Sequence, residues 1–307
     1  MLKSEKNKKF FPWLIVGMAS FLVLNLVFLG YFYFVQNQEI KPVPVLTPKK
    51  NLKIIFLDVG QGDAILIKTP EKKNILIDGG PDKSIIYKLD QQLPFYERKI
   101  DCMILTHPDP DHLNGLVEVL KRYQVEQVFY NGVDDMDSTY LEFLKEIEEK
   151  KIKKEIVWLG KFIELDGLKL EILFPFENLS GQSFKNDNEA SMVFKLTLGQ
   201  VKILLTGDAT KKVEEQLIKS NLDLKADLLK VAHHGARDAT SLEFLENVKP
   251  TYAVISVGKN RFGHPSLRVL RNLEKVSAQI LRTDKLGDII FETDGKGLKL
   301  KTNNFPQ

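Results

Sequence analysis

Beyond residue 51 the sequence predicts a mixed α/β fold, in which two β-sheets pack face to face and helices cover their outer faces. Short β-branched apolar runs end at Gly or Pro, as strands do. Stretches with helical periodicity separate these runs. A strand–strand–helix–strand order occurs twice, roughly over residues 52–160 and 161–302. This repeated order predicts two mixed sheets with helices outside.

The first half contains strand-like runs bounded by turn residues and two segments with a helical apolar stripe. Strands are expected at 52–60, 64–70, 74–80, 100–107 and 155–160, and helices at 113–123 and 138–151. The second helix is rich in charge, which is typical of a solvated helix face.

The second half has the same kinds of element and closes with a hairpin. Strands are expected at 168–175, 191–199, 201–208, 226–235 and 251–258, and helices at 210–220, 240–248 and 265–276. Residues 287–295 and 297–302 are expected to pair as a closing hairpin.

Residues 1–36 predict a short cytoplasmic tail followed by a single transmembrane helix. Four lysines and one glutamate lie within residues 1–9, and residues 10–35 then run for 26 positions without a charge. About 20 apolar residues suffice to cross a bilayer as a helix. Aromatic residues cluster at both ends of the run, as they do at membrane interfaces. The flanking lysines predict a cytoplasmic N-terminus, with the rest of the chain extracytoplasmic at the cell membrane.

A cleaved signal peptide is the alternative for this segment. Its apolar region is usually ~7–15 residues long and ends in a small-residue cleavage site, whereas this run is longer and ends in "YFYFVQNQ". Residues 37–51 are polar and contain three prolines, which predicts an extended linker. Residues 52–307 would then form the folded domain.

Charge and cysteine content exclude some classes of protein. Without residues 1–9 the chain has 40 basic and 40 acidic residues, so no global basic signal for nucleic acid is present. A site for a polyanion would have to be local. Cys102 is the single cysteine, which excludes a disulfide framework and a cysteine-based zinc site within one chain. Its apolar surroundings, "IDCMILT", predict an inert core residue.

All histidines of the chain follow strand-like runs or lie in loops bounded by Gly or Pro. They are His107, His112, His233, His234 and His264. A lone histidine is usually a solvated or hydrogen-bonded structural residue. The shared placement of all of them at strand ends favours a common site instead.

The stretch "HPDPDH" carries His107, Asp109, Asp111 and His112 directly after the run "CMILT". Alternating positions in an extended turn direct side chains toward the same side, so these residues can surround one or two metal ions. Imidazole with carboxylate suits zinc, manganese or iron. The alternative is a solvated polar turn, or an Asp-Pro turn that caps the next helix.

Two later stretches supply the remaining ligands that such a site needs. Two ions ~3.5–4 Å apart require a bridging ligand, and Asp208 in "ILLTGDA" is the candidate. A further imidazole is available from His233 or His234 in "LLKVAHHGA". The three stretches in this order favour a metal site over a polar turn.

Together these stretches resemble the metallo-β-lactamase superfamily, and within it the hydrolase-like domain of the ComEC family of DNA-uptake (competence) proteins. The resemblance covers roughly residues 52–297 and rests on "FLDVGQGDAILI", "NILIDGG", "LTHPDPDHLNGL", "NEASMVFKL", "LLTGDAT", "LLKVAHHGA", "AVISVGKNRFGHPS" and "RTDKLGDIIFETDG". It implies an αββα sandwich and, as cofactors, one or two divalent metal ions, zinc or manganese.

The resemblance also implies metal ligands: His107 and Asp109 for a first ion, Asp111 and His112 for a second, Asp208 as the bridge, and His234. Asp109 stands where many members have histidine, which makes the site more anionic and manganese as suitable as zinc. His234 is favoured because the last ligand histidine of the superfamily typically precedes a glycine. His233 would then face the substrate.

One departure from the superfamily pattern concerns the first ion. Many members carry a further histidine before the "GD" stretch, whereas no histidine occurs between 113 and 232 here. Asn188 and Ser191 of "NEAS" are available instead, so the first ion is expected to be weakly held, or absent without substrate.

Other residues are implied to support the site or to contact the substrate. Asp78 in "LIDGG" would orient a ligand histidine. Asp58 and Asp63 lie in "LDVGQGD", whose glycines let the backbone approach closely; a turn cap is the alternative for a strand-end aspartate. Lys259 and Arg261, beside His264, are candidates for phosphate contacts.

The function that follows is metal-dependent hydrolysis, with a phosphodiester as the favoured bond and Asp111, His233 and His264 as catalytic residues. The expected substrate is DNA at the cell surface, as a single strand during uptake, or another phosphodiester. Because one anchor cannot form a pore, uptake would need a separate membrane channel protein as a partner; otherwise the chain is a stand-alone hydrolase. Alternatives are a phosphocholine-type esterase, a nucleotide phosphodiesterase or a lactonase on the same scaffold. A non-catalytic module of a DNA-uptake complex is a further alternative, which would not need the full ligand set.

Overall fold

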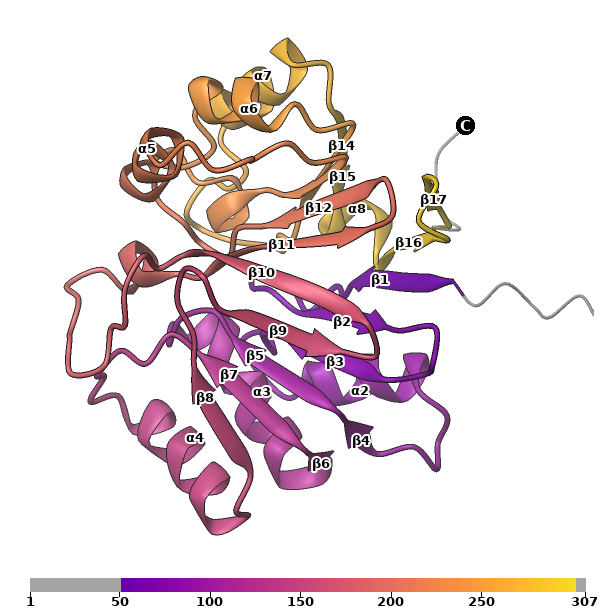
Figure 1. Ribbon diagram of the computed structural model, residues 1–307, viewed down its shortest axis with the longest axis vertical. Helices are drawn as coiled ribbons and strands as arrows, with labels where there is room; N and C mark the ends of the chain where they lie inside the picture. The colour runs from indigo at the N-terminus through magenta and orange to yellow at the C-terminus, as the bar shows by residue number, and fades with distance from the viewer. Residues whose placement is uncertain (1–50, 302–307) are drawn as a thin grey trace, which may run out of the picture. The chain divides into compact units, whose positions relative to one another are not determined.

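The computed structural model describes residues 51–301, which form two β-sheets between two layers of helices (Figure 1). The first sheet has the strand order β17-β16-β1-β2-β3-β5-β7-β8. Its strands are β1 (Leu52–Phe56), β2 (Ile65–Lys68), β3 (Asn74–Ile77), β5 (Cys102–Leu105), β7 (Gln127–Tyr130), β8 (Lys153–Ile156), β16 (Ile289–Thr293) and β17 (Leu298–Leu300).

The second sheet has the strand order β15-β14-β13-β12-β11-β10-β9. Its strands are β9 (Phe162–Leu165), β10 (Leu168–Phe174), β11 (Val193–Leu198), β12 (Val201–Leu205), β13 (Leu228–Lys230), β14 (Tyr252–Ile255) and β15 (Gln279–Arg282). A small separate pairing joins β4 (Lys99–Ile100) and β6 (Gln124–Val125). Both large sheets combine parallel and antiparallel pairs, as the sequence predicts.

Helices cover the outer face of each sheet. The first sheet carries α2 (Ser84–Gln92), α3 (Pro110–Arg122) and α4 (Ser138–Glu149), and the second carries α5 (Lys211–Lys219), α6 (Leu242–Val248) and α7 (Leu267–Lys275) (Figure 1). The connections contain the short α8 (Thr283–Leu286) and two 3₁₀ turns, η1 (Asp187–Ala190) and η2 (Ala232–Gly235). Each helical layer shares one apolar cluster with its own sheet.

A third apolar cluster lies between the two sheets. Phe56 and Phe291 of the first sheet and Phe194 of the second are fully buried there. Strands covered on both faces are apolar along their whole length, which explains the unbroken runs in β3 and β5. Burial of each phenylalanine stabilises the fold by about 1.5–3 kcal/mol.

Most predicted elements are confirmed, and the differences concern several short strands, the helix α2 and the placement of the closing hairpin. The hairpin of β16 and β17 forms as predicted, but it pairs with β1 and so completes the first sheet. The strand predicted at 155–160 lies earlier, at β8, and the chain turns after Ile156. The elements without a predicted counterpart are α2, β6, β7, β9, η1, β15 and α8.

Within residues 51–301, none of the helices combines the length and apolar character needed to cross a membrane. The predicted anchor at 10–35 lies outside the described residues, as does nearly all of the predicted linker.

The parallel strands bring their carboxyl ends to a common edge of each sheet. β3, β5 and β7 run parallel in the first sheet, and β12, β13 and β14 run parallel in the second. Helix α3 begins at this edge, where a β-carbon on Gly115 would lie 1.8 Å from the carbonyl oxygen of Gly79. Glycine at both positions therefore lets α3 pack directly against the end of β3.

Candidate metal centre

A buried carboxylate at the end of β3 orients the histidines of the "HPDPDH" stretch. Asp78 accepts hydrogen bonds from the backbone N–H of Thr106 at 2.9 Å and from its Oγ1 at 2.8 Å. Its Oδ2 also lies 2.8 Å from Nδ1 of His112. A proton held on Nδ1 by this contact leaves Nε2 of His112 as the ligand atom. His107 has its Nδ1 2.9 Å from Oγ1 of Thr106, which leaves its Nε2 free in the same way.

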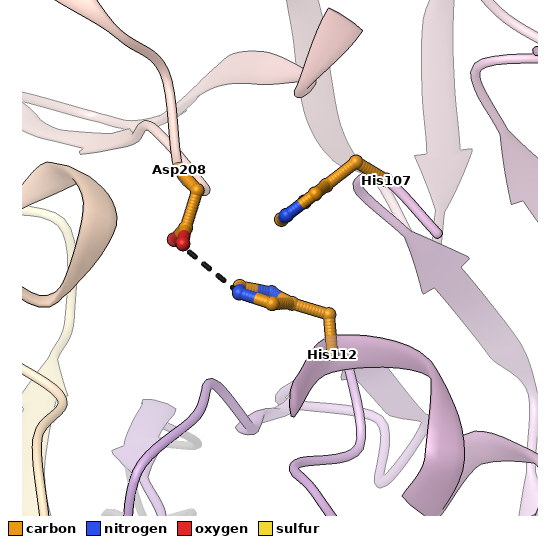
Figure 2. Close-up of side chains that lie close together, drawn as sticks. All are labelled: His107, His112 and Asp208. Carbon is orange, nitrogen blue, oxygen red and sulfur yellow. Dashed lines mark ion pairs between the residues drawn. The ribbon is translucent and has the colours of Figure 1, made fainter. Parts of the chain in front are cut away.

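His107 after β5, His112 in the first turn of α3 and Asp208 after β12 point toward one another (Figure 2). Nε2 of His112 lies 3.3 Å from Oδ1 of Asp208, and the two imidazole rings are 4.1 Å apart between centroids. The Nε2 atoms of both histidines are buried and have no hydrogen-bond partner. A buried, unsatisfied nitrogen is costly, and a metal ion at this point would satisfy both. The donor set therefore fits a divalent ion.

The second sheet contributes a histidine through the tight turn η2, directly after β13. His234 has its Nδ1 2.8 Å from the carbonyl oxygen of Ser256, which fixes the ring. Its Nε2 lies 3.1 Å from Oδ2 of Asp111 and 3.3 Å from Oδ2 of Asp208. Both His233 and His234 have positive φ, at 49° and 52°. Such strained backbone is commonly found at functional sites, and here it turns the two rings in different directions.

Asp208 lies between the candidate ligands of the two sheets, and Ser191 and Lys230 fix its position. Its backbone N–H donates to Oγ of Ser191 at 2.9 Å. Lys230, which is 0% exposed, places its Nζ 3.4 Å from Oδ1 of Asp208 and donates to the carbonyl oxygen of Gly207 at 2.9 Å. Lys230 also forms an ion pair with the buried Asp63. The sequence signal for this residue was a lysine in the otherwise apolar run "LLKVA", and the prediction missed it.

The charges at the centre act strongly on one another. Burial alone would raise the pKa of Asp208, but the facing charges of His234, His112 and Lys230 outweigh burial and hold that pKa well below its usual range. Burial would lower the pKa of His234, yet Asp208 and Asp111 raise it to about 10. The pKa of His112 is raised well above its usual value, against burial, by Asp208 and Asp78. The raised pKa values of His112 and His234 indicate a negative potential at these two rings, which favours a bound cation.

Three groups of side chains have ligand atoms within 4.8 Å of one another, and two of them are the candidate ion sites, because the third, Asp63, Asp78 and His112, uses the Nδ1 side of His112 that Asp78 already occupies. One comprises His107, His112 and Asp208, and the other comprises Asp111, His112 and His234. His112 belongs to both groups. The sequence had instead assigned His107 and Asp109 to a first ion and Asp111 and His112 to a second. Asp109 lies at the border of the first group, with Oδ2 3.5 Å from Nε2 of His107.

His233 and His264 line the outer rim of the centre. His233 is 22% exposed, with its Nε2 3.9 Å from Oδ2 of Asp208 and 3.4 Å from Nδ2 of Asn188. Its Nδ1 lies 3.4 Å from Oδ1 of Asp238. The ring of His264 is 5.5 Å from that of His233. The structure thus places His234 among the candidate ligands and His233 toward the opening.

The remaining predicted residues differ in their distance from the centre. Oγ of Ser191 lies 3.4 Å from Nδ1 of His107, and Asp63 lies 3.5 Å from Nδ1 of His234. Asp58 is not brought into the cluster, because its carboxylate accepts from the backbone N–H of Gly60 within its own turn. Lys259 and Arg261 are exposed on the loop that leads to His264.

A sandwich of two mixed sheets with histidines and aspartates gathered at the strand ends defines a class of metal-dependent hydrolases. The family model described as the metallo-beta-lactamase superfamily matches residues 57–259, and the chain belongs to this superfamily. The predicted fold and family are therefore confirmed.

The curated proteins similar to this chain include competence proteins. The chain is 30% identical over 257 residues to ComE operon protein 3 of Bacillus subtilis (strain 168), covering 78% of this chain and 33% of that protein. It is 28% identical over 262 residues to competence protein ComA of Neisseria gonorrhoeae, covering 83% of this chain and 34% of that protein. The chain therefore spans about a third of the length of these relatives.

Solved structures with the same fold are more distant in sequence. The metallo-beta-lactamase fold protein YhfI from Bacillus subtilis superposes with a TM-score of 0.56 at 11% identity, covering 80% of this chain and 100% of that one. CmlA, a diiron beta-hydroxylase from Streptomyces venezuelae, gives a TM-score of 0.52 at 12% identity, covering 80% and 55%. At 11–12% identity these similarities establish a shared fold only.

Proposed function

We propose that the chain is a metal-dependent phosphodiesterase that cuts single-stranded DNA at the outer face of the cell membrane during DNA uptake. The observation that carries this proposal is the meeting of His107, His112, Asp111, His234 and Asp208 at one point, with two imidazole nitrogens left unpartnered. The relatives named as competence proteins support the choice of DNA.

The proposed cofactor is one or two ions of zinc or manganese. His107, His112 and Asp208 would hold one ion, and Asp111 and His234 would hold another with Asp208 between them. Bound there, such an ion would polarise a phosphoryl oxygen and lower the pKa of a water molecule toward neutrality. The carboxylates of Asp109 and Asp111 make the site more anionic than an all-histidine site, which suits manganese.

The protein's own groups would orient the phosphodiester and move protons. His233 is the best placed for proton transfer, because Asp238 faces its Nδ1 and its Nε2 is directed toward Asp208. A proton on Nε2 of His233 would then pass to the leaving oxygen. His264, next to it, would contact the phosphate or share this task. Asp111, whose Oδ2 lies 3.1 Å from Nε2 of His234, would share an ion with that nitrogen and so set the position of the reacting groups.

The proposed location is extracytoplasmic, with residues 1–36 as a single-pass anchor. The tail lysines and the uncharged run at 10–35 support this orientation. A separate membrane channel protein is the proposed partner for moving the intact strand.

The test compares hydrolysis of a single-stranded oligonucleotide with that of a small phosphodiester, bis(4-nitrophenyl) phosphate. The full chain is assayed with zinc or with manganese, beside Asp208→Asn and a control, Asp82→Asn, which changes an exposed carboxylate in the same way. We expect the wild type and the control to cut both substrates, and Asp208→Asn to lose both activities.

Cleavage of the small diester alone would overturn DNA as the substrate while leaving a phosphodiesterase of another kind. No turnover of either substrate by a folded, metal-loaded chain would overturn the proposed chemistry. Full activity in Asp208→Asn would show that the metal centre does not carry the reaction.

A further inference from the structure

A rigid loop, residues 259–264, borders the metal centre. Asn260 holds it together: its Nδ2 donates to the carbonyl oxygens of Gly258 and His264 at 2.9 Å each. Its Oδ1 accepts from the backbone N–H groups of Phe262 at 3.1 Å and His264 at 3.0 Å. The Asn260 side chain thus connects both ends of the loop and its tip by hydrogen bonds, so the loop is preorganised for a ligand.

The tip of this loop combines an exposed ring with two cations. Phe262 is 64% exposed, although a phenylalanine is ordinarily buried. Lys259 and Arg261 flank it, and neither forms an ion pair with any residue in the described part of the chain. A hollow of about 540 Å³ lies here, lined by Gln61, Lys259, Asn260, Arg261 and Phe262. The guanidinium of Arg261 lies 5.9 Å from the centre of the Phe262 ring. An aromatic ring beside cations that have no carboxylate partner is an arrangement that binds single-stranded nucleic acid.

The loop is continuous with the metal centre. The rings of His234, His233, His264 and Phe262 follow one another, with centroid separations of 6.2, 5.5 and 5.6 Å. The base of the loop also touches the glycine-rich turn after β1, where a β-carbon on Gly258 would lie 2.4 Å from Gly60. A chain bound on the loop would therefore lead directly to the candidate ligands.

The charges around the centre are unevenly distributed. On the side of Asp109, the carboxylate of Asp187 faces the negative charges of Asp109 and Asp135. The loop carries Lys259 and Arg261 instead. A polyanion is repelled on the first side and attracted on the second, so the loop is the favoured approach.

We propose that Phe262 is a stacking platform for one base of single-stranded nucleic acid, whose neighbouring phosphates contact Lys259 and Arg261. This inference rests on the proposed function and specifies how the same site would take its substrate. Stacking accepts every base, so the platform would bind without sequence preference.

Binding is measured with the full chain carrying Asp208→Asn, so that the probe is not cut. The probe is a fluorescently labelled single-stranded oligonucleotide, followed by anisotropy. Adding Phe262→Ala is expected to weaken binding roughly 5- to 150-fold, the range for loss of one base–aromatic stack. The matched control is Phe95→Ala, a phenylalanine that is 89% exposed. It lies on the loop before β4, at the opposite end of the first sheet, and should leave the affinity unchanged.

The cations are tested through salt dependence. Each phosphate contact on single strands contributes about 0.7 to the slope of log affinity against log salt concentration. Replacing both Lys259 and Arg261 by alanine should therefore reduce the slope by roughly 1.4. An unchanged slope would contradict the assigned phosphate contacts.

A cleavage assay separates failure of this inference from failure of the proposed function. In an otherwise wild-type chain, Phe262→Ala should lower the ratio of kcat/KM for the oligonucleotide to kcat/KM for bis(4-nitrophenyl) phosphate. If that ratio and the binding affinity stay at wild-type values, the platform is wrong while the nuclease stands. If the wild type neither binds nor cuts the oligonucleotide but cuts the small diester, both are overturned.

Discussion

Asp78→Asn is the change that tests most sharply how the metal centre is built. The substitution keeps the shape of the side chain and suits the positive φ of 55° at this position, because asparagine tolerates left-handed backbone. The amide oxygen can still accept from the backbone N–H of Thr106. The amide nitrogen then faces Nδ1 of His112 as a second donor. His112 must release the proton on Nδ1 and carry it on Nε2, which removes the lone pair from the ligand position.

The expected magnitude follows from the loss of the contact that orients His112, and the hydrogen bond from Oγ1 of Thr106 to the same carboxylate oxygen is lost with it. Removing the partner of a ligand histidine typically costs 10- to 100-fold in metal affinity, or about 1.4–2.7 kcal/mol. The affected contact is the 2.8 Å approach of Oδ2 to Nδ1 of His112. Since His112 belongs to both candidate groups, the loss should extend to every ion that the centre holds.

Zinc and manganese affinities would be measured by competition with a chromophoric chelator. Asp82→Asn is the control, since this exposed aspartate also accepts a backbone hydrogen bond, from Ser84 at 2.8 Å. It should bind metal like the wild type. A folded Asp78→Asn chain with wild-type affinity would refute the argument that Asp78 sets the proton position on His112.

Three further predictions concern the fold around the centre. Gly115→Ala should lower the free energy of unfolding by about 1–3 kcal/mol or more, because the new β-carbon would lie 1.8 Å from the carbonyl oxygen of Gly79; an unchanged thermal midpoint would contradict this. Phe194→Ala should cost about 3–5 kcal/mol in denaturant unfolding, since the ring is fully buried between the sheets; a cost under about 1 kcal/mol would contradict that burial. Burial, assisted by Asp101, raises the pKa of the Cys102 thiol far above its usual value. Alkylation of this thiol at neutral pH should therefore require denaturant. Rapid alkylation of the native chain would show that Cys102 is accessible to solvent and would contradict its burial.

The residues of the centre could be predicted because their signals are local. A histidine or aspartate directly after an apolar strand-like run marks a strand end, and parallel strand ends meet at one edge of a sheet. His107, Asp208 and His234 were found in this way. The same reasoning could not decide between His233 and His234, because that choice depends on the positive φ of both residues in η2.

The parts that could not be predicted depend on partners far away in sequence. Lys230 is buried only because Asp63 and Asp208 meet it from two other segments. The pairing of β16 with β1 likewise has no local signal, since either sheet could have received the closing hairpin. Helix α2 could not be predicted because its apolar stripe is short, with Ile85 and Leu89 as its buried residues.

The most direct test of the account is the number of metal ions bound per chain. The full chain would be equilibrated with zinc or manganese, dialysed, and assayed by elemental analysis beside Asp208→Asn, with protection of Cys102 from alkylation as the check of folding. The account predicts that the wild type retains one or two equivalents and that Asp208→Asn retains fewer. A folded wild type that retains no metal would contradict the central claim that these side chains form a metal centre.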